Sequence, residues 1–410
     1  MTVSRGRSSR RRRLKREVYL YALIFFFLVY QYNEMLKLTD ETPSLDKQVV
    51  IKDSDGNEVS KSSSSLSHFL GNSGNSNVRN VTFAEASHGR EPIMSILNDA
   101  GIMDMAVSDL LKLPKWEEIE TLYGKEPMVL GLETCEAFRK RVPPEQRFIA
   151  VAGMFNSGTT AFGLSLQANC RFPEHQKDLT NGLVKDVNGM LNQPPWAKHK
   201  DARWIENSTI HPGIVKEYVL PVILIRDPYF WMHSMCKEGY GARWDHNSEK
   251  HCPNLVPNTY DRKRFKRLKD ASSVSVWMGG SRRKGPSWPS LIHLWNDWYE
   301  SYFNADFPRL IIRFEDTLYH GEQVLRQVCR CGGAEHNSKM SYVVNEAKWN
   351  HRASQNNMIS AIIKYGTHSR RYDNMTDADL LFASAELNAD LMEVFRYKQQ
   401  KTETVQSPPQ

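Results

Sequence analysis

Hydrophobic and polar positions divide the chain into successive segments. An uncharged apolar and aromatic run, VYLYALIFFFLVYQY, begins at residue 18 and predicts a membrane segment over residues 18–34. Residues 35–92 are polar and rich in Ser, Asn and Gly, so we expect a disordered stem that has too few large apolar residues for a core. From residue 93 to residue 398 apolar positions recur with the periods of helices and strands, which predicts one folded body.

Three short apolar runs within the body predict buried strands. They cover residues 147–152, 219–225 and 310–314. Pro221 falls inside the second run, and because proline cannot donate to a strand ladder, we expect an edge strand there or a start one residue later. Glu315 and Asp316, directly after the third run, are expected to cap the helix that follows.

Helical patterns alternate with these strands. Apolar positions at helical spacing cover residues 93–111, 160–167 and 322–331, and the aromatic segment 295–303 is typical of an amphipathic core helix. A strand–helix alternation of this kind predicts an α/β fold, in which helices cover both faces of a parallel sheet.

The net charge of +7 lies in a basic N-terminal tail, residues 1–17. Eight Arg and Lys residues between Arg5 and Arg16, less Glu17, account for all of it, so the remainder is electroneutral. A nucleic-acid surface would carry its positive charge on the folded domain, so this distribution argues against nucleic acid as a partner. Residues 399–410 form a polar tail that we expect to be disordered.

The basic tail followed by the apolar run predicts a single membrane anchor. The alternative is a cleaved signal peptide, but Asn33, Glu34 and Met35 follow the run without a small-residue cleavage site. Fifteen apolar residues span only about 22 Å as a helix, so flanking residues must contribute or the membrane must be thin. The positive-inside rule then places the tail in the cytosol and the body in a lumen.

The cysteines and glycosylation signals agree with a luminal body. Six cysteines are an even number, and disulfides are permitted in an oxidising lumen, although the sequence leaves the pairing open. Cys236 and Cys252 would close the shortest plausible loop. Asn80, Asn207 and Asn374 each begin an N-glycosylation triplet. No cysteine or histidine cluster has zinc spacing, so we expect no metal site.

A phosphate-binding loop is predicted at residues 153–160, GMFNSGTT, between a strand and a helix. Gly153 and Gly158 permit the tight turn, and the amides from Ser157 onward would face a phosphate at the positive helix end. Thr159 stands where nucleotide triphosphatases have Lys, which favours a ligand that is not a triphosphate. The alternative is an ordinary glycine-containing turn.

A second anion motif follows the run at residues 219–225. In RDPYFWMHSMCK, Arg226 stands at the strand end and Ser234 eight residues later on a helix. A forked guanidinium and a hydroxyl can hold a terminal phosphate from two sides. The alternative is an Arg-Asp-Pro turn in which Arg226 pairs with a carboxylate.

These two motifs resemble those of the sulfotransferases that use 3′-phosphoadenosine 5′-phosphosulfate (PAPS). The S-G-T-T of the loop resembles the family's 5′-phosphosulfate loop, the Arg226–Ser234 spacing resembles its 3′-phosphate motif, and softer likeness extends over residues 310–317 and 391–397. The loop departs from the family at Asn156, where a basic residue is usual, and Lys198 is the candidate substitute. The resemblance implies PAPS as donor, no metal, and donor-binding residues Asn156, Ser157, Gly158, Thr159, Thr160, Arg226 and Ser234.

The remaining candidates concern catalysis. A general base must reach the acceptor, and the resemblance favours His199 beside Lys198, in PPWAKHK at residues 194–200. Glu174, His175 and His211 are the alternative bases. Arg370, in the basic loop YGTHSRR at residues 365–371, could close over the nucleotide or belong, with Arg371, to a solvated charge run.

Together these features predict a type II Golgi membrane protein whose luminal domain transfers a sulfuryl group from PAPS to a hydroxyl or amine, foremost of a carbohydrate. A P-loop kinase or nucleotide triphosphatase is one alternative, and the missing loop lysine disfavours it. A catalytically inactive PAPS-binding protein that keeps the fold is the other.

Overall fold

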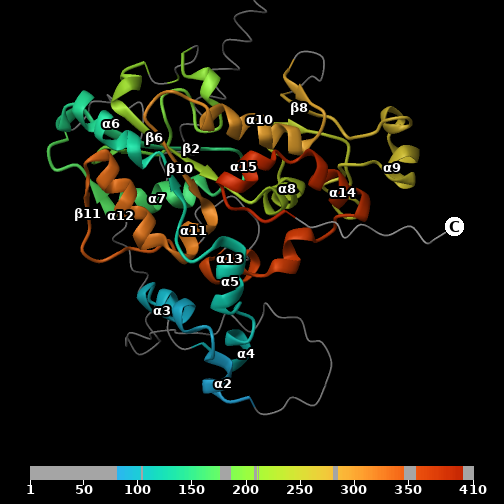
Figure 1. The fold of residues 1–410 in the computed structure, drawn as a ribbon, viewed down its shortest axis with the longest axis horizontal. Helices are drawn as coiled ribbons and strands as arrows, with labels where there is room; N and C mark the ends of the chain where they lie inside the picture. The colour runs from blue at the N-terminus through green and yellow to red at the C-terminus, as the bar shows by residue number, and fades with distance from the viewer. Residues whose placement is uncertain are drawn as a thin grey trace, which may run out of the picture. The chain divides into compact units, whose positions relative to one another are not determined.

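The computed structural model of the protein describes residues 81–102, 105–175, 186–206, 210, 212–279, 285–345 and 357–399 (Figure 1). The chain divides into two compact units, residues 1–78 and 79–410, and the described residues belong to the second. The predicted membrane segment 18–34 lies outside the described residues. Among those that are described, no helix is both long and apolar enough to span a bilayer.

A mainly parallel sheet forms the centre of this unit. In the described part of the chain it has six strands, in the order β1-β10-β6-β2-β5-β4, with β10, β6, β2 and β5 parallel and the two outer strands antiparallel to their neighbours. These strands are β1 Val129–Leu130, β2 Phe148–Gly153, β4 Asp186–Val187, β5 Met190–Leu191, β6 Val219–Ile225 and β10 Leu310–Arg313. The three predicted strands are therefore present at the centre of the sheet.

Pro221 lies in a central strand that begins at Val219, so both alternatives, an edge strand and a start one residue later, were wrong. β6 pairs with β2 on one side, where Pro221 stands opposite Ala150, and with β10 on the other. The pairing with β10 begins only at Val222, opposite Leu310. Pro221 therefore precedes the first β10 pair, which makes the missing N–H tolerable within an interior strand.

Helices cover both faces of the sheet. Successive strand residues point to opposite faces, and they join different cores: Val151 packs with apolar residues of α7 and α12, whereas Ala152 packs with those of α10 and α15. Figure 1 shows these two pairs of helices on either side of the strands. The helices of the two layers are α6 Cys135–Arg141, α7 Thr159–Asn169, α8 Pro228–Lys237, α10 Leu291–Phe303, α12 Gly321–Gly332 and α15 Ala389–Val394. The α/β class and the flanked parallel sheet are confirmed.

The other elements are shorter. Further helices are α2 Phe83–Ser87, α3 Glu91–Asp99, α4 Val107–Leu110, α5 Trp116–Tyr123, α9 Thr259–Arg264, α11 Phe314–Tyr319, α13 Met358–Gly366 and α14 Asp377–Glu386, with the 3₁₀ segments η4 Ala202–Trp204 and η7 His368–Tyr372. Two small sheets contain β3 Cys170–Arg171 with β11 Glu335–His336, and β7 Ala242–Arg243 with β8 Val276–Met278 and β9 Ser287–Trp288. The helical pattern predicted over residues 93–111 is two helices, α3 and α4. α2 and the start of α3 fall within the segment expected to be a stem.

Disulfides and a buried carboxylate pair fix the ends of these elements. The pairs Cys135–Cys331 and Cys170–Cys329 link α6 and β3 to α12, and Cys236–Cys252 is the third.

Glu315 and Asp316 lie inside the first turn of α11 and do not cap it, contrary to the expectation. Asp316 instead accepts two bonds of 2.7 Å from Arg313, and Glu315 accepts one from the Asp227 amide.

Candidate functional site

The predicted phosphate loop connects the carboxyl end of β2 to α7. Gly158 has a φ of 87°, and a Cβ built on it would lie 2.2 Å from the Phe314 ring. A Cβ on Gly153 would lie 2.5 Å from the Ser157 Oγ. Both contacts are shorter than atoms allow, so the loop keeps this shape only with glycine at both positions.

The loop leaves the beginning of α7 open to an anion. Gly158 is the residue that precedes the helix, and because it has no side chain it cannot cap the first amides there. The Ser157 hydroxyl donates to the Met154 carbonyl at 2.7 Å, and the Ser157 amide turns back to the same carbonyl at 3.3 Å. Ser157 therefore stabilises the turn, while the amides of Thr159 and Thr160 lie in the first turn of the helix, where an anion is favoured.

The second motif meets the loop, as the two strand ends predicted. Arg226, at the end of β6, donates to the carbonyl oxygen of Asn156 and, at 3.3 Å, to the Ser234 Oγ. Its guanidinium lies 4.6 Å from the Phe314 ring centroid and also contacts the Tyr365 hydroxyl. Arg226 and the loop thus form one cluster with Ser234, at the carboxyl ends of two adjacent strands.

Arg226 is not the arginine of a structural ion pair. Its neighbour Asp227 pairs with Arg371 at 2.8 Å and caps α8 by accepting the Tyr229 amide at 3.0 Å. Within the described residues no carboxylate lies within ion-pair distance of Arg226. Arg371 is buried, so the alternative of a solvated charge run is wrong for it.

More positive charge surrounds Arg226 than the sequence analysis assigned. Burial, and next the charges of Arg226, Lys237 and Arg370, lower the pKa of Lys364 to about 7, against an opposing effect of Asp373. Burial lowers the pKa of Arg226 itself to about 10, although the charge of Glu315 opposes this effect. Cations held close together in this way are unfavourable unless an anion joins them, which makes the cluster a candidate anion site.

Lys364 and Lys237 are the residues that sequence reasoning missed. Lys237 is the last residue of the segment already singled out for Arg226 and Ser234, and Lys364 directly precedes the basic loop at residues 365–371. Arg370 is exposed in η7, and its charge contributes to the lowered pKa of Lys364. Proximity to the two motifs was the available signal.

His199 is held at the other side of the same loop. Its Nδ1 lies 2.7 Å from the Gly153 carbonyl oxygen. A carbonyl only accepts, so Nδ1 carries the hydrogen and Nε2 is the basic nitrogen of the neutral ring. The Gly153 amide donates to the Lys198 carbonyl at 3.0 Å, and Ala197 before it has a φ of 80°. This strained residue turns the chain so that Lys198 and His199 both line one cavity.

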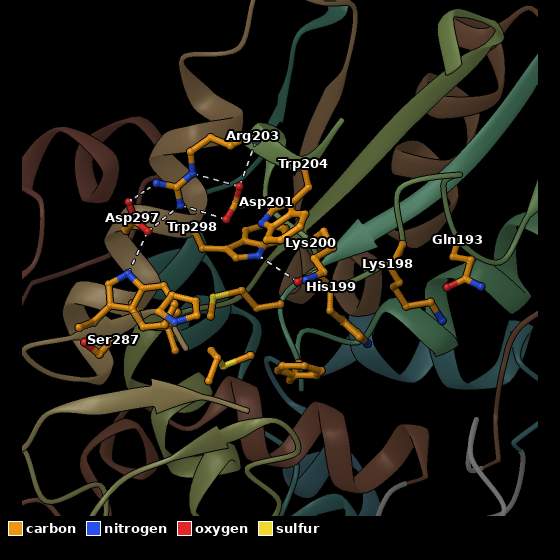
Figure 2. A pocket seen from close by; sticks show the side chains of 17 residues that line it. Gln193, Lys198, His199, Lys200, Asp201, Arg203, Trp204, Ser287, Asp297 and Trp298 are labelled. Carbon is orange, nitrogen blue, oxygen red and sulfur yellow. Dashed lines mark hydrogen bonds and ion pairs between the residues drawn. The ribbon is translucent and has the colours of Figure 1, made fainter. Parts of the chain in front are cut away.

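That cavity has a volume of about 990 Å³ and adjoins the phosphate loop (Figure 2). Met154 and Phe155 of the loop form part of its wall, and the Phe155 ring lies 4.5 Å from that of His199. The next residue, Asn156, faces the Arg226 cluster through its carbonyl oxygen. The loop therefore separates the cation cluster from the cavity.

Asn156 has a structural role in place of the basic residue expected there. It adopts a φ of 61°, and its Nδ2 donates to the Glu238 carbonyl at 2.8 Å, which ties the loop to the end of α8. Lys198, the proposed substitute, lies along the cavity wall beside Gln193 in Figure 2.

The structure does not bring Glu174 or His175 to this site. The His175 ring packs 4.8 Å from Phe148, the first residue of β2, and bonds Asp186 at 2.9 Å. The loop lies at the other end of β2, which is about 17–20 Å away for a six-residue strand. The physical reason is that α7 returns the chain to the amino end of the sheet. His211 lies outside the described residues.

Among the described residues, no group of three or more His, Cys, Asp or Glu side chains is placed to hold a metal ion.

Comparisons with known proteins do not assign this chain to a family. No model of a known protein family matches the sequence, and no curated protein is significantly similar to it.

Proposed function

We propose that this protein is a PAPS-dependent sulfotransferase, and that it acts on a hydroxyl or amine, foremost of a carbohydrate. It would work as a single-pass type II Golgi membrane protein with its body in the lumen. The observation that carries the proposal is the junction of the two motifs, because Arg226 bonds both the Asn156 carbonyl and Ser234 at adjacent strand ends. A nucleotide with phosphates on both sides of its ribose needs two anion sites that are close but separate.

The two halves of the site fit the two ends of the donor. The 5′-phosphosulfate would lie at the start of α7, where the amides of Thr159 and Thr160 and the helix dipole favour negative charge. The 3′-phosphate would be held by Arg226, Ser234 and Lys364, with Arg370 closing over it. Its charge would neutralise the cations that lower the pKa of Lys364.

His199 is the proposed general base for the transfer. Its Nε2 would take the proton of the acceptor hydroxyl as the acceptor oxygen bonds to sulfur, and the bond from sulfur to the phosphate oxygen breaks. The products are a sulfate ester and adenosine 3′,5′-bisphosphate, and the proton then leaves His199 for solvent. The start of α7 and Lys198 would stabilise the departing phosphate, so positioning and electrostatics supply the rate.

The direct test incubates the full-length protein, in detergent, with sulfur-labelled PAPS and a panel of glycans, peptides and phenols. We expect label on one class of acceptor. His199→Ala should abolish the transfer and keep the affinity for adenosine 3′,5′-bisphosphate. Glu174→Gln and His175→Gln are matched controls at the opposite end of β2, and both should keep the transfer.

The other two functions would give different results in the same assay. A kinase would transfer phosphate from ATP and magnesium and leave PAPS unused. An inactive binding protein would bind adenosine 3′,5′-bisphosphate and label no acceptor. Either result would overturn the proposal.

A further inference from the structure

The cavity beside His199 contains an exposed aromatic surface that no packing explains. Trp204 is 41% exposed, and its ring lies under the Lys200 ammonium, 3.8 Å from the ring centroid. Trp288 and Trp298 line the same cavity. A tryptophan that is held in place and left open to a cavity is suited to a ligand with a flat apolar face.

Hydrogen bonds and ion pairs within the protein hold the polar side chains of the same cavity in place. Arg203 donates to Asp201 at 3.0 Å and to Asp297 at 2.7 Å, and the Trp288 indole nitrogen donates to Asp297 at 2.9 Å. The Asp297 side chain is nevertheless 36% exposed. Because a carboxylate has about four acceptor positions, Asp297 can accept further hydrogen bonds from a ligand, whereas Asp201, 12% exposed, mainly holds Arg203 in place. Figure 2 shows this group on the other side of the cavity from Lys198 and Gln193.

We infer that this cavity binds an oligosaccharide acceptor, a class of substrate that presents both apolar ring faces and many hydroxyl donors. The part of this inference that makes the oligosaccharide a sulfuryl acceptor rests on the proposed function. The part that places an oligosaccharide in the cavity does not. Trp204 and Trp288, which are at least partly exposed, suit the C–H faces of pyranose rings, and Asp297 suits a hydroxyl group. A simple phenol would use the tryptophans, but beyond its reacting hydroxyl it has no further donor for the open acceptor positions of Asp297.

The volume and the lining of the cavity indicate the orientation of the acceptor. A volume of about 990 Å³ is near the upper end of the roughly 300–1,000 Å³ of small-molecule pockets, so it has room for more than one sugar ring. His199 and Phe155 lie at the loop, and Trp288 and Asp297 come from β9 and α10. The reacting hydroxyl would therefore lie at His199, and the remaining rings would extend toward Trp204 and Asp297.

The test uses the full-length protein with three tetrasaccharides as probes: maltotetraose, chitotetraose and a uronic acid–hexosamine tetrasaccharide. Binding is followed by tryptophan fluorescence, and transfer from labelled PAPS is measured in parallel, with a tyrosine peptide and a simple phenol as competing acceptors. At least one tetrasaccharide should change the fluorescence and accept label. Trp204→Ala should lower the affinity for that tetrasaccharide about tenfold, and Asp297→Asn should lower it by a similar factor.

Controls separate a lost contact from a lost fold. Both variants should keep the melting temperature and the affinity for adenosine 3′,5′-bisphosphate, and Leu381→Ala, at an exposed leucine outside the cavity, should change nothing. Labelling of the peptide or the phenol alone, with no tetrasaccharide bound, would overturn the inference and leave the sulfotransferase proposal intact. Tetrasaccharide binding that depends on Trp204, without any binding of the bisphosphate, would support the inference and overturn the proposed function.

Discussion

The buried and half-buried cations of the body form two groups, which differ in whether a carboxylate pairs with them. Arg313 and Arg371 each contact a buried carboxylate, Asp316 at 2.7 Å and Asp227 at 2.8 Å. Arg226 and Lys364 have no such partner among the described carboxylates, and burial lowers the pKa of each. The paired cations thus complete the fold, whereas we propose that the cations without a carboxylate partner bind an anionic ligand.

The largest effect should come from breaking a paired cation. Arg313→Ala leaves Asp316 buried without its guanidinium, so we expect a loss of about 3–5 kcal/mol in the free energy of unfolding, measured by denaturant titration. Arg326→Ala is the matched control, because its pair with Glu322 is exposed, and it should change little. Equal stability of the two variants would contradict the structural role of Arg313.

Arg226→Ala should have the reverse profile. The change removes the guanidinium that we propose binds the 3′-phosphate, so the affinity for adenosine 3′,5′-bisphosphate should fall about 100-fold in calorimetric titration. The free energy of unfolding should fall by much less than in Arg313→Ala, since no buried carboxylate is left without a partner. If Arg226→Ala unfolds as readily as Arg313→Ala and still binds the nucleotide, Arg226 belongs to the first group.

Lys364 should make nucleotide binding dependent on pH. Its pKa of about 7 in the empty protein means that it loses its charge as the pH rises above neutrality. Affinity for the bisphosphate should therefore fall, by about tenfold between pH 7 and pH 8.5, because a bound anion favours the protonated amine. Lys364→Arg keeps its charge over this range and should remove the decline. An unchanged decline in that variant would assign the titration to another group.

His251 should give the smallest effect, on stability alone. Burial of its ring lowers the pKa, but the bonds to Asp379 at 2.8 Å and Asp261 at 2.6 Å outweigh burial and raise it above the ordinary value. The stabilisation is complete below the pKa of the unfolded chain and is lost as the pH rises through the folded value. The melting temperature of the protein should fall by a few degrees across that window. His251→Phe, which should be less stable at every pH because Asp261 and Asp379 lose the ring, should not show this dependence on pH.

Sequence patterns predicted those parts of the molecule that depend on neighbouring residues. β2, β6 and β10 are buried on both faces and therefore are continuous apolar runs, and the loop that ends at Gly158 needs glycine for its own backbone. Arg226 and Ser234 could be predicted as a pair because they are eight residues apart, the first at the end of a strand and the second on the helix that follows.

Long-range packing determines the rest, and no local pattern records it. Lys364 reaches Arg226 from α13, far along the chain, and the three tryptophans of the cavity come from separate segments. Glu174 follows the phosphate loop closely in sequence, but α7 carries it to the opposite end of the sheet. The disulfide partners of α12 likewise depend on the folded arrangement of α6 and β3.

Calorimetric titration of the full-length protein with adenosine 3′,5′-bisphosphate tests the central claim most directly. The account predicts one binding site, and it predicts that adenosine 5′-monophosphate, which lacks the phosphate assigned to Arg226, binds at least about tenfold more weakly. Equal affinities for the two nucleotides, or no heat with either, would contradict the assignment of the unpaired cations to a nucleotide phosphate.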